Sequence, residues 1–270
     1  MVCVGCKHET RPAAPSASAT SRTSTPPSRS VEADPYDPTH ITFATIPSGN
    51  IRTGSVTSEP GRDSRMERRV TVAVEPFEIS QTEITVAQYL AITAPGSRPS
   101  SSEANLPINN ITWFQAKQFC EVMTIRTGVR HRLPTEAEWE FACRAGTTGL
   151  ISVWNGRNSL EESIRSYHRG DPGKITRGLK ASCNVDTSKV MPVAQFPINA
   201  FGLYDTHGNV WEWISDDDTI TEPPSPLHAP IRGGSAISTN VFECRSANRA
   251  WQFKDNSTDA IGFRVVREIY

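Results

Sequence analysis

Residues 132–146 read RLPTEAEWEFACRAG, and this stretch carries the best-marked helix of the chain. Thr135 and Glu138 have the spacing of a capping box. In such a box the hydroxyl accepts from the N3 amide while the carboxylate accepts from the N-cap amide. A proline precedes the cap, and Gly146 is well placed to end the helix after Arg144. The stretch therefore predicts a helix that begins at the cap and buries part of the EWEFAC segment.

The segments on either side predict a mixture of short strands and helices. Alternating β-branched and aromatic residues predict strands at 41–46, 70–74 and 77–79. The spacing of apolar residues predicts helices over 82–93 and from Thr112 onward. The second of these helices should bury Trp113, Ala116, Phe119, Cys120 and Met123. Downstream of residue 146 we expect mostly short strands, turns and irregular loops, with a terminal strand at 262–266.

Composition limits the kinds of partner that the chain can bind. There are 28 Lys and Arg against 29 Asp and Glu, so the net charge is −1. This balance predicts no affinity for nucleic acid or for an anionic membrane surface. No stretch approaches the roughly 18 apolar residues that a membrane helix needs. The 17 glycines and 20 prolines indicate a loop-rich α+β body rather than a helical bundle.

The N-terminal region differs from the rest of the chain. Residues 10–30 are rich in Ser, Thr and Pro, and their only apolar side chains belong to alanine. Such a segment cannot bury enough surface to offset its ordering entropy, so residues 1–38 are predicted to be a disordered tether. Gly5-Cys6 ahead of it resembles the lipid-attachment site of a bacterial lipoprotein, although only five residues precede Cys6. We expect export, to the periplasm or to a lipid anchor, while a cytoplasmic location stays open.

Three segments taken together point to a known family. They are residues 132–146, residues 199–213 (NAFGLYDTHGNVWEW), and the Arg-Gly-Gly-Ser at 232–235, which leads to CRSA at 244–247 and GFR at 262–264. In this order they resemble the formylglycine-generating enzyme, or sulfatase-modifying factor, family. The likeness covers about residues 41–270. It implies one irregular, loop-rich α+β domain over 39–270, with a fold related to C-type lectins.

The resemblance also implies an active site, and the sequence departs from it. In active members two cysteines follow the Arg-Gly-Gly-Ser segment, bind copper(I) and oxidise a cysteine in a sulfatase Cys-x-Pro-x-Arg motif to formylglycine. Two soft thiolates suit copper(I), and a hydroxyl does not replace them. Here Ser238 stands where the first cysteine is expected, and the second has no counterpart. We therefore predict no catalytic residues of this kind and no copper.

A disulfide is implied by the same comparison. Cys244 matches a structural cysteine of the family, whose partner matches Cys143 at the end of the capped helix. The resemblance implies a Cys143–Cys244 bridge in an oxidising compartment. Two buried free thiols are the alternative. The second family disulfide is half missing, because Cys120 matches one end and Val265 occupies the other.

Calcium is the cofactor that the resemblance favours. Hard cations bind carboxylate and carbonyl oxygens in short loops turned by glycine. Four positions match the calcium ligands of one family site: Asp205, Gly208, Val210 and Glu212. Asn184 matches the start of a second calcium site, whose other half lies in a shortened loop. The acidic run 216–218 indicates a solvated loop, with an additional ion site as the alternative.

These observations lead to two main hypotheses about function. The first is a non-oxidase, calcium-stabilised binding or accessory module of an exported bacterial protein, a pseudoenzyme whose ligand is a peptide, a protein or a sugar. By resemblance, its groove would include Ser235, Ser238 and Arg249. The alternative is a formylglycine-generating oxidase with a diverged active site. An accessory role in sulfoxide synthesis by an iron enzyme is a remote third possibility, because those enzymes carry their metal histidines largely in a separate domain.

Overall fold

The computed structural model describes residues 40–156, 159–217, 220 and 222–269. The tether predicted for residues 1–38 lies outside the described residues. Within the described part, no helix is long and apolar enough to cross a membrane. The strand and helix bounds below refer to this part of the chain.

The first sheet has four antiparallel strands in the order β1-β4-β10-β5. Its strands are β1 (Phe43–Ile46), β4 (Phe77–Ser80), β10 (Val266–Glu268) and β5 (His131–Arg132). β1 pairs with β4 so that Ile46 faces Phe77 and Phe43 faces Ser80. β10 then pairs with β4 on its other side, which brings the C-terminal strand beside the first strands of the domain. The strands predicted at 41–46 and 77–79 are confirmed.

The second sheet contains parts of the segments 199–213 and 262–264, which carry the family likeness. Its order is β8-β7-β6-β9, built from β8 (Arg249–Phe253), β7 (His228–Arg232), β6 (Trp211–Trp213) and β9 (Ile261–Gly262). β6 pairs with β9 in parallel, whereas its pairing with β7 is antiparallel. A separate hairpin joins β2 (Gly49–Arg52) to β3 (Thr71–Val74), and β3 confirms the strand predicted near 70–74.

Three helices begin with complete capping boxes. They are α1 (Val86–Thr93) after Thr85, α2 (Trp113–Thr127) after Thr112, and α3 (Glu136–Arg144) after Thr135. In α3 the Glu138 amide donates to Thr135 Oγ1 at 3.2 Å, and the Thr135 amide donates to Glu138 Oε2 at 2.8 Å. The predicted capping box is confirmed. The buried face of α2 is also the predicted one: Trp113, Ala116, Phe119, Cys120 and Met123.

Two expectations for the downstream half are wrong. Two helices lie where mostly loops were expected, namely α4 (Leu160–His168) and α5 (Gly173–Ser182). The strand expected at 262–266 is broken between β9 and β10. Residues 263 and 265 there accept hydrogen bonds from the amides of Ile84 and Ser80, so this stretch crosses from one sheet to the other.

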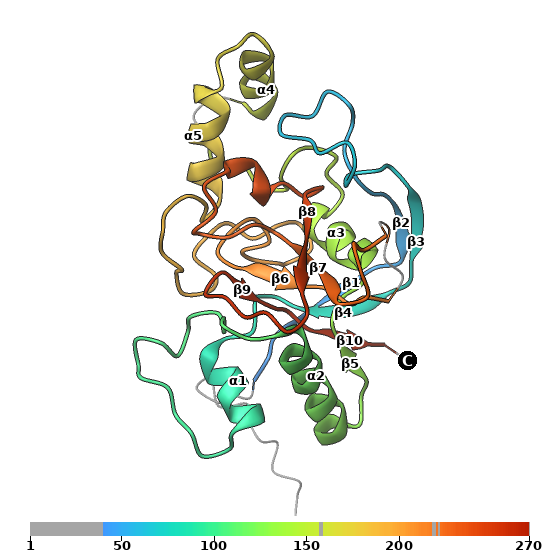
Figure 1. The fold of residues 1–270 in the computed structure, drawn as a ribbon, viewed down its shortest axis with the longest axis vertical. Coiled ribbons are helices and arrows are strands. Elements are labelled where there is room, and N and C mark those ends of the chain that lie inside the picture. Colours follow the sequence, from blue (N-terminus) through green and yellow to red (C-terminus); the bar gives the residue numbers. More distant parts are fainter. Residues whose placement is uncertain (1–39, 157–158, 218–219, 221, 270) are drawn as a thin grey trace, which may run out of the picture. The chain divides into compact units, whose positions relative to one another are not determined.

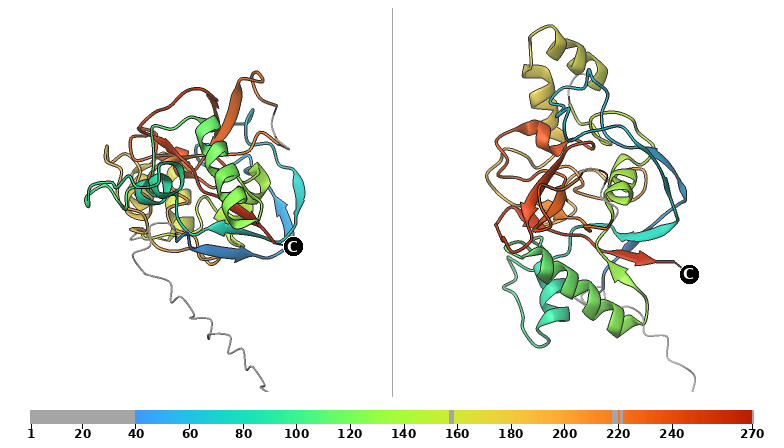
Figure 2. Two further views of the ribbon diagram at one scale, coloured as in Figure 1. Left: turned by 90° about the horizontal axis from the view of Figure 1, so that it is seen from below. Right: turned by 45° about the vertical axis from the view of Figure 1, so that its right-hand side comes forward.

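The elements form layers around several apolar clusters. α1 and α2 lie at one end of the described domain and α4 and α5 at the other, with the two four-stranded sheets between them (Figures 1 and 2). One cluster joins α2 to the second sheet through Trp113, Phe119, Trp213 and Phe263. Another cluster packs α5 against η1, a 3-10 turn at Val241–Cys244. The result is a mixed α/β, loop-rich domain, as the sequence predicts.

Candidate functional site

The loop from Asp205 to Glu212 is shaped by residues with positive φ. Asp205, Gly208 and Asn209 have φ values of 56°, 101° and 64°. A β-carbon on Gly208 would lie 2.4 Å from the carbonyl oxygen of Asn184, so only glycine permits this approach. The Asn209 amide donates to the same carbonyl at 2.8 Å. The structure thus brings together the two segments for which calcium sites are predicted, 205–212 and the one that starts at Asn184.

The Asn184 side chain is fully engaged by its own neighbourhood. Its Nδ2 donates to the Lys189 carbonyl and to Asn209 Oδ1, both at 3.0 Å. Its Oδ1 accepts from the Thr187 hydroxyl at 2.5 Å. The Asn184 side chain therefore ties the segment 184–189 to the loop that contains Asn209.

Glu212 forms a buried ion pair with Arg264. The guanidinium donates from Nε to Oε2 and from Nη2 to Oε1, both at 2.7 Å. The indole of Trp139 adds a donor to Oε2 at 2.6 Å. All three side chains are almost fully buried. This bidentate pair links β6 to the stretch between β9 and β10. Both carboxylate oxygens of Glu212 therefore accept hydrogen bonds from buried side chains.

Two further acids lie buried beside this pair. Glu83 Oε1 accepts from Asn209 Nδ2 at 3.1 Å, while its buried Oε2 has no hydrogen-bond partner among the described residues. Burial, together with the charges of Asp205 and Glu212, raises the pKa of Glu83 well above its ordinary value. Asp205 Oδ2 accepts from the Ala194 amide at 2.5 Å. Burial, reinforced by the charge of Glu212, raises the pKa of Asp205 to about 6.

This arrangement does not fit the predicted calcium site. Calcium needs six to eight oxygens turned toward one point. Here Glu212 faces a guanidinium and an indole, and Asn184 Oδ1 faces a hydroxyl. Among the described residues, no group of three or more acidic, histidine or cysteine side chains is arranged to hold a metal. We derive no role for calcium from these residues.

The three residues expected in the groove lie inside the domain. Ser235 and Ser238 are 1% and 7% exposed, and their hydroxyl oxygens are 3.1 Å apart. Ser238 Oγ also accepts from the Ser235 amide at 3.2 Å. Arg249 is 4% exposed and faces Glu136 and Glu140 at 3.3 and 3.5 Å. The two serines therefore form one turn, whereas Arg249 belongs to a buried ion cluster.

That ion cluster centres on Glu140 of α3. Its Oε1 accepts from the Gly54 amide and from Arg144, and its Oε2 accepts from Arg232 at 2.6 Å. Burial alone would raise the pKa of Glu140, but Arg232, Arg144 and Arg249 outweigh it and hold the pKa below its ordinary value. We did not single out Glu140 from sequence. Its signal is a glutamate on the helix face that also carries Trp139 and Cys143.

The cysteine bridge implied by the resemblance stays a prediction, and the structure contains free thiols. Cys143 and Cys244 are free, as are Cys120 and Cys183, and all four are buried. The thiol of Cys183 donates a hydrogen bond to Cys244, which lowers the pKa of Cys244, whereas burial raises the pKa of Cys183 well above its ordinary value. Cys244 Sγ in turn lies 3.0 Å from the Val241 carbonyl. Cys183 is therefore the thiol that lowers the pKa of Cys244, and no sulfur–sulfur bond joins the four described cysteines.

His207, in the loop 205–212, contacts two of the buried cysteines, Cys143 and Cys244. Its Nε2 accepts from the Ser152 amide at 3.0 Å, so its Nδ1 carries the proton and donates to the Cys244 carbonyl at 2.8 Å. Cys143 Sγ lies 3.7 Å from Nε2. Burial lowers the pKa of His207, which keeps the ring neutral. His207 therefore fixes the backbone around Cys244.

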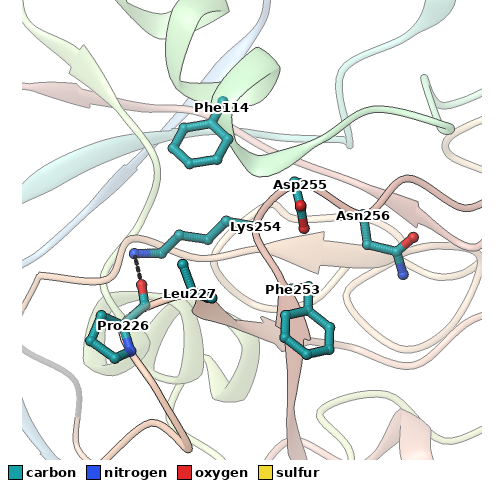
Figure 3. A pocket seen from close by; sticks show the side chains of 7 residues that line it. All are labelled: Phe114, Pro226, Leu227, Phe253, Lys254, Asp255 and Asn256. Carbon is teal, nitrogen blue, oxygen red and sulfur yellow. Dashed lines mark hydrogen bonds between the residues drawn. The ribbon is translucent and has the colours of Figure 1, made fainter.

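The surface carries an apolar pocket of about 730 Å³ beside β7 and β8. Phe114 is 56% exposed, Leu227 67% and Phe253 48%. Figure 3 shows Lys254 stretched between these side chains, with its ammonium bonded to the Pro226 carbonyl at 2.9 Å. The same ammonium pairs with Asp216 at 2.7 Å. Asp216, from the predicted acidic loop, is therefore an ion-pair partner.

Comparison with known proteins accounts for the whole described domain. The family model "Sulfatase-modifying factor enzyme 1-like domain" matches residues 28–269. Formylglycine-generating enzyme of Mus musculus is 32% identical over 185 residues, which are 63% of this chain and 47% of that protein. Inactive C-alpha-formylglycine-generating enzyme 2 of Mus musculus is 32% identical over 164 residues, 59% of this chain and 48% of that protein. The chain spans about half the length of these curated relatives.

A solved structure shows the same fold. PvdO from Pseudomonas aeruginosa superimposes with a TM-score of 0.66 at 26% identity, covering 84% of this chain and 94% of that one. The segments that carry the family likeness are also those that form α3, β6 and the buried Glu212–Arg264 pair. The chain therefore belongs to the sulfatase-modifying factor family.

Proposed function

We propose that this chain is a binding or accessory domain of the family and does not oxidise sulfatase cysteines. The observation that carries the proposal is the burial of the four thiols that the structure describes. Cys120 is 3% exposed, and Cys143, Cys183 and Cys244 are 0% exposed. Copper(I) oxidation of a substrate cysteine needs thiolates that the metal, oxygen and the peptide can reach.

The chemistry of the thiols supports the same proposal. Burial raises the pKa of Cys120 and raises that of Cys143 to about 11, so both stay protonated near neutral pH. Cys244 follows the Arg-Gly-Gly-Ser segment in sequence, but it packs in the apolar cluster between α5 and η1. The relatives leave both functions open, because an enzyme and a protein named inactive are each 32% identical to this chain.

The test is turnover of a Cys-x-Pro-x-Arg peptide with copper(I), reductant and oxygen, followed by intact-mass spectrometry of the peptide. The formylglycine-generating enzyme of Streptomyces coelicolor, which is 26% identical over 265 residues, serves as the positive control. We expect no mass change with this chain and full conversion with the control. Conversion of thiol to aldehyde by this chain, lost in Cys244→Ser, would establish the oxidase instead.

A further inference from the structure

The arginine loop, defined as residues 53–70 between β2 and β3, concentrates positive charge on one surface. Arg62, Arg65, Arg68 and Arg69 fall within one short run, and Arg52 ends β2 beside it. Among the described residues, the side chains of the exposed Arg52, Arg68 and Arg69 have no ion-pair or hydrogen-bond partner. Because these five arginines outnumber the three acids of the loop, Glu59, Asp63 and Glu67, this surface carries net positive charge.

Two of the three acids of the arginine loop, Glu59 and Glu67, point inward, whereas Asp63 pairs with Arg65 at 3.6 Å on the surface. Arg245 is fully buried and bonds Glu59 at 2.7 Å and Glu67 at 2.9 Å through Nη1. Its Nη2 also donates to the Gly61 carbonyl at 2.6 Å. Glu67 accepts in addition from the Ser55 hydroxyl at 2.6 Å. These contacts pair Glu59 and Glu67 with one guanidinium and fasten the loop to the core, so the backbone that carries the outward arginines is ordered before any ligand arrives.

The loop forms two adjoining pockets that share Val56 and Arg69. The outer pocket, of about 440 Å³, is lined by Arg62, Arg65 and Arg68 together with hydroxyl side chains. The inner pocket, of about 160 Å³, is lined by apolar and polar side chains, and its charged residues include Arg52, Arg144 and Glu59. Its walls include Ile51, Val56 and Phe141. A cavity of about 150 Å³ is large enough for a benzene ring, so the inner pocket has room for one apolar side chain.

The charge and shape of these pockets specify the chemistry of a ligand. Guanidinium groups bind carboxylates through paired hydrogen bonds, and several of them here have no other partner. An apolar wall of Ile51, Val56 and Phe141, flanked by these groups, suits a side chain that lies between acidic residues. A polysaccharide sulfate or a nucleic-acid phosphate would satisfy the arginines but leave the inner pocket unused.

We propose that the arginine loop binds an acidic peptide segment of a partner protein, with one aromatic or branched apolar side chain in the inner pocket. The proposal rests on the proposed function, because it names the partner of a binding domain. It gives the domain an interaction surface on β2, the arginine loop and the start of the loop after α3.

The experiment measures fluorescence anisotropy with a fluorescein-labelled heptapeptide that has a central phenylalanine between glutamates. The test variant is Arg65→Glu/Arg68→Glu/Arg69→Glu. The matched control is Arg98→Glu/Arg177→Glu/Lys189→Glu, which changes the net charge equally at exposed positions outside the loop. We expect the test variant to bind on the order of tenfold more weakly or worse, the control to bind nearly as the parent does, and binding to weaken with salt.

A second comparison uses the same peptide with glycine in place of phenylalanine, and heparin as a competing polyanion. We expect the glycine peptide to bind more weakly, because the inner pocket is then empty. Equal binding by the test variant and the parent would overturn the proposal. So would heparin binding that exceeds peptide binding while phenylalanine gives no advantage. Thermal melting checks that each variant is folded. The turnover assay is independent of this readout, so failure of the arginine-loop proposal and failure of the non-oxidase proposal are distinguishable.

Discussion

At the scale of single residues, the buried carboxyl of Asp205 predicts a pH-dependent change in stability. A carboxyl whose folded pKa is raised to about 6 binds a proton in the folded state at pH values where the unfolded state has lost it. Its contribution to stability therefore falls as pH rises from about 4 to about 6 and stays unfavourable above that. Asp205→Asn keeps an acceptor for the Ala194 amide and removes the charge. Asparagine also tolerates the φ of 56°.

We expect Asp205→Asn to raise the free energy of unfolding at pH 7 in calcium-free buffer by about 1–2 kcal/mol. The gain should shrink toward pH 4, where the wild-type carboxyl is itself protonated. Urea denaturation at several pH values measures both effects. If calcium instead raises the melting temperature of the wild type and not that of Asp205→Asn, the loop is a calcium site after all.

For Glu140 we expect the opposite effect, namely that removing its charge destabilises the domain. Glu140 neutralises part of the charge of three buried arginines, and Glu140→Gln leaves them short of a partner. Breaking a buried pair in this way costs about 3–5 kcal/mol. We expect Glu140→Gln to lower the denaturation midpoint strongly, and Glu103→Gln on the exposed surface to leave it unchanged.

The pH dependence of the free energy of unfolding, compared between wild type and Glu140→Gln, separates the loss of the ion pairs from a loss of packing. The folded pKa of Glu140 lies below its ordinary value, so its stabilisation is present above the unfolded pKa of about 4.3 and is lost as pH falls through the folded value. The difference between wild type and Glu140→Gln should therefore narrow on acidification. A difference that is constant from neutral to acidic pH would contradict the ion-pair account.

At the scale of secondary-structure elements, helix α3 links the capping box to the buried ion cluster. Thr135 caps the helix, and Glu138 also pairs with Arg132 at 2.6 Å. We expect Thr135→Ala to destabilise the domain by about 1 kcal/mol, and Thr135→Ser to keep most of the stability because the hydroxyl remains. Urea unfolding of the two variants measures this. Equal stability of the alanine and serine variants would show that the cap does not support α3.

The same scale shows what could be predicted from the sequence. Helices α1 to α3 have local start signals and clear apolar faces, so they could be located to within a few residues. Helix α5 could not, because it starts at a proline without a side-chain cap and contains Gly178. That glycine is needed, since a β-carbon there would lie 2.1 Å from the Trp154 ring. Sequence patterns penalise a glycine inside a helix, whereas here packing from another segment requires it.

The site could be predicted only in part, again because contacts from distant segments decide its structure. The segment 205–212 and the capped helix do meet in space, as the family likeness implies. The partners that decide their chemistry come from distant segments. Arg264 takes up Glu212, and Cys183 lies against Cys244. No local pattern reports these contacts, so they could not be predicted from the sequence, and the calcium ligands and the disulfide stay predictions.

At the scale of the whole molecule, the described domain buries its four thiols and presents an arginine surface to solvent. The interior thiols argue against oxidation of a substrate, and the outward guanidinium groups argue for recognition of an acidic partner. Both statements depend on the same packing, because Arg245, which anchors the arginine loop, directly follows Cys244 in the chain. An opening of η1 large enough to expose Cys244 would also disturb the anchor of the arginine loop.

The measurement that tests this account most directly is the reactivity of each cysteine in the folded protein. The native protein is treated with iodoacetamide at neutral pH, then unfolded and treated with a second, heavier alkylating reagent, and each site is mapped by mass spectrometry. The account predicts that Cys120, Cys143, Cys183 and Cys244 take only the heavier label, and that no disulfide is found among them. Rapid native labelling of Cys244, with the remaining three protected, would contradict it and would indicate a thiol open to copper and substrate.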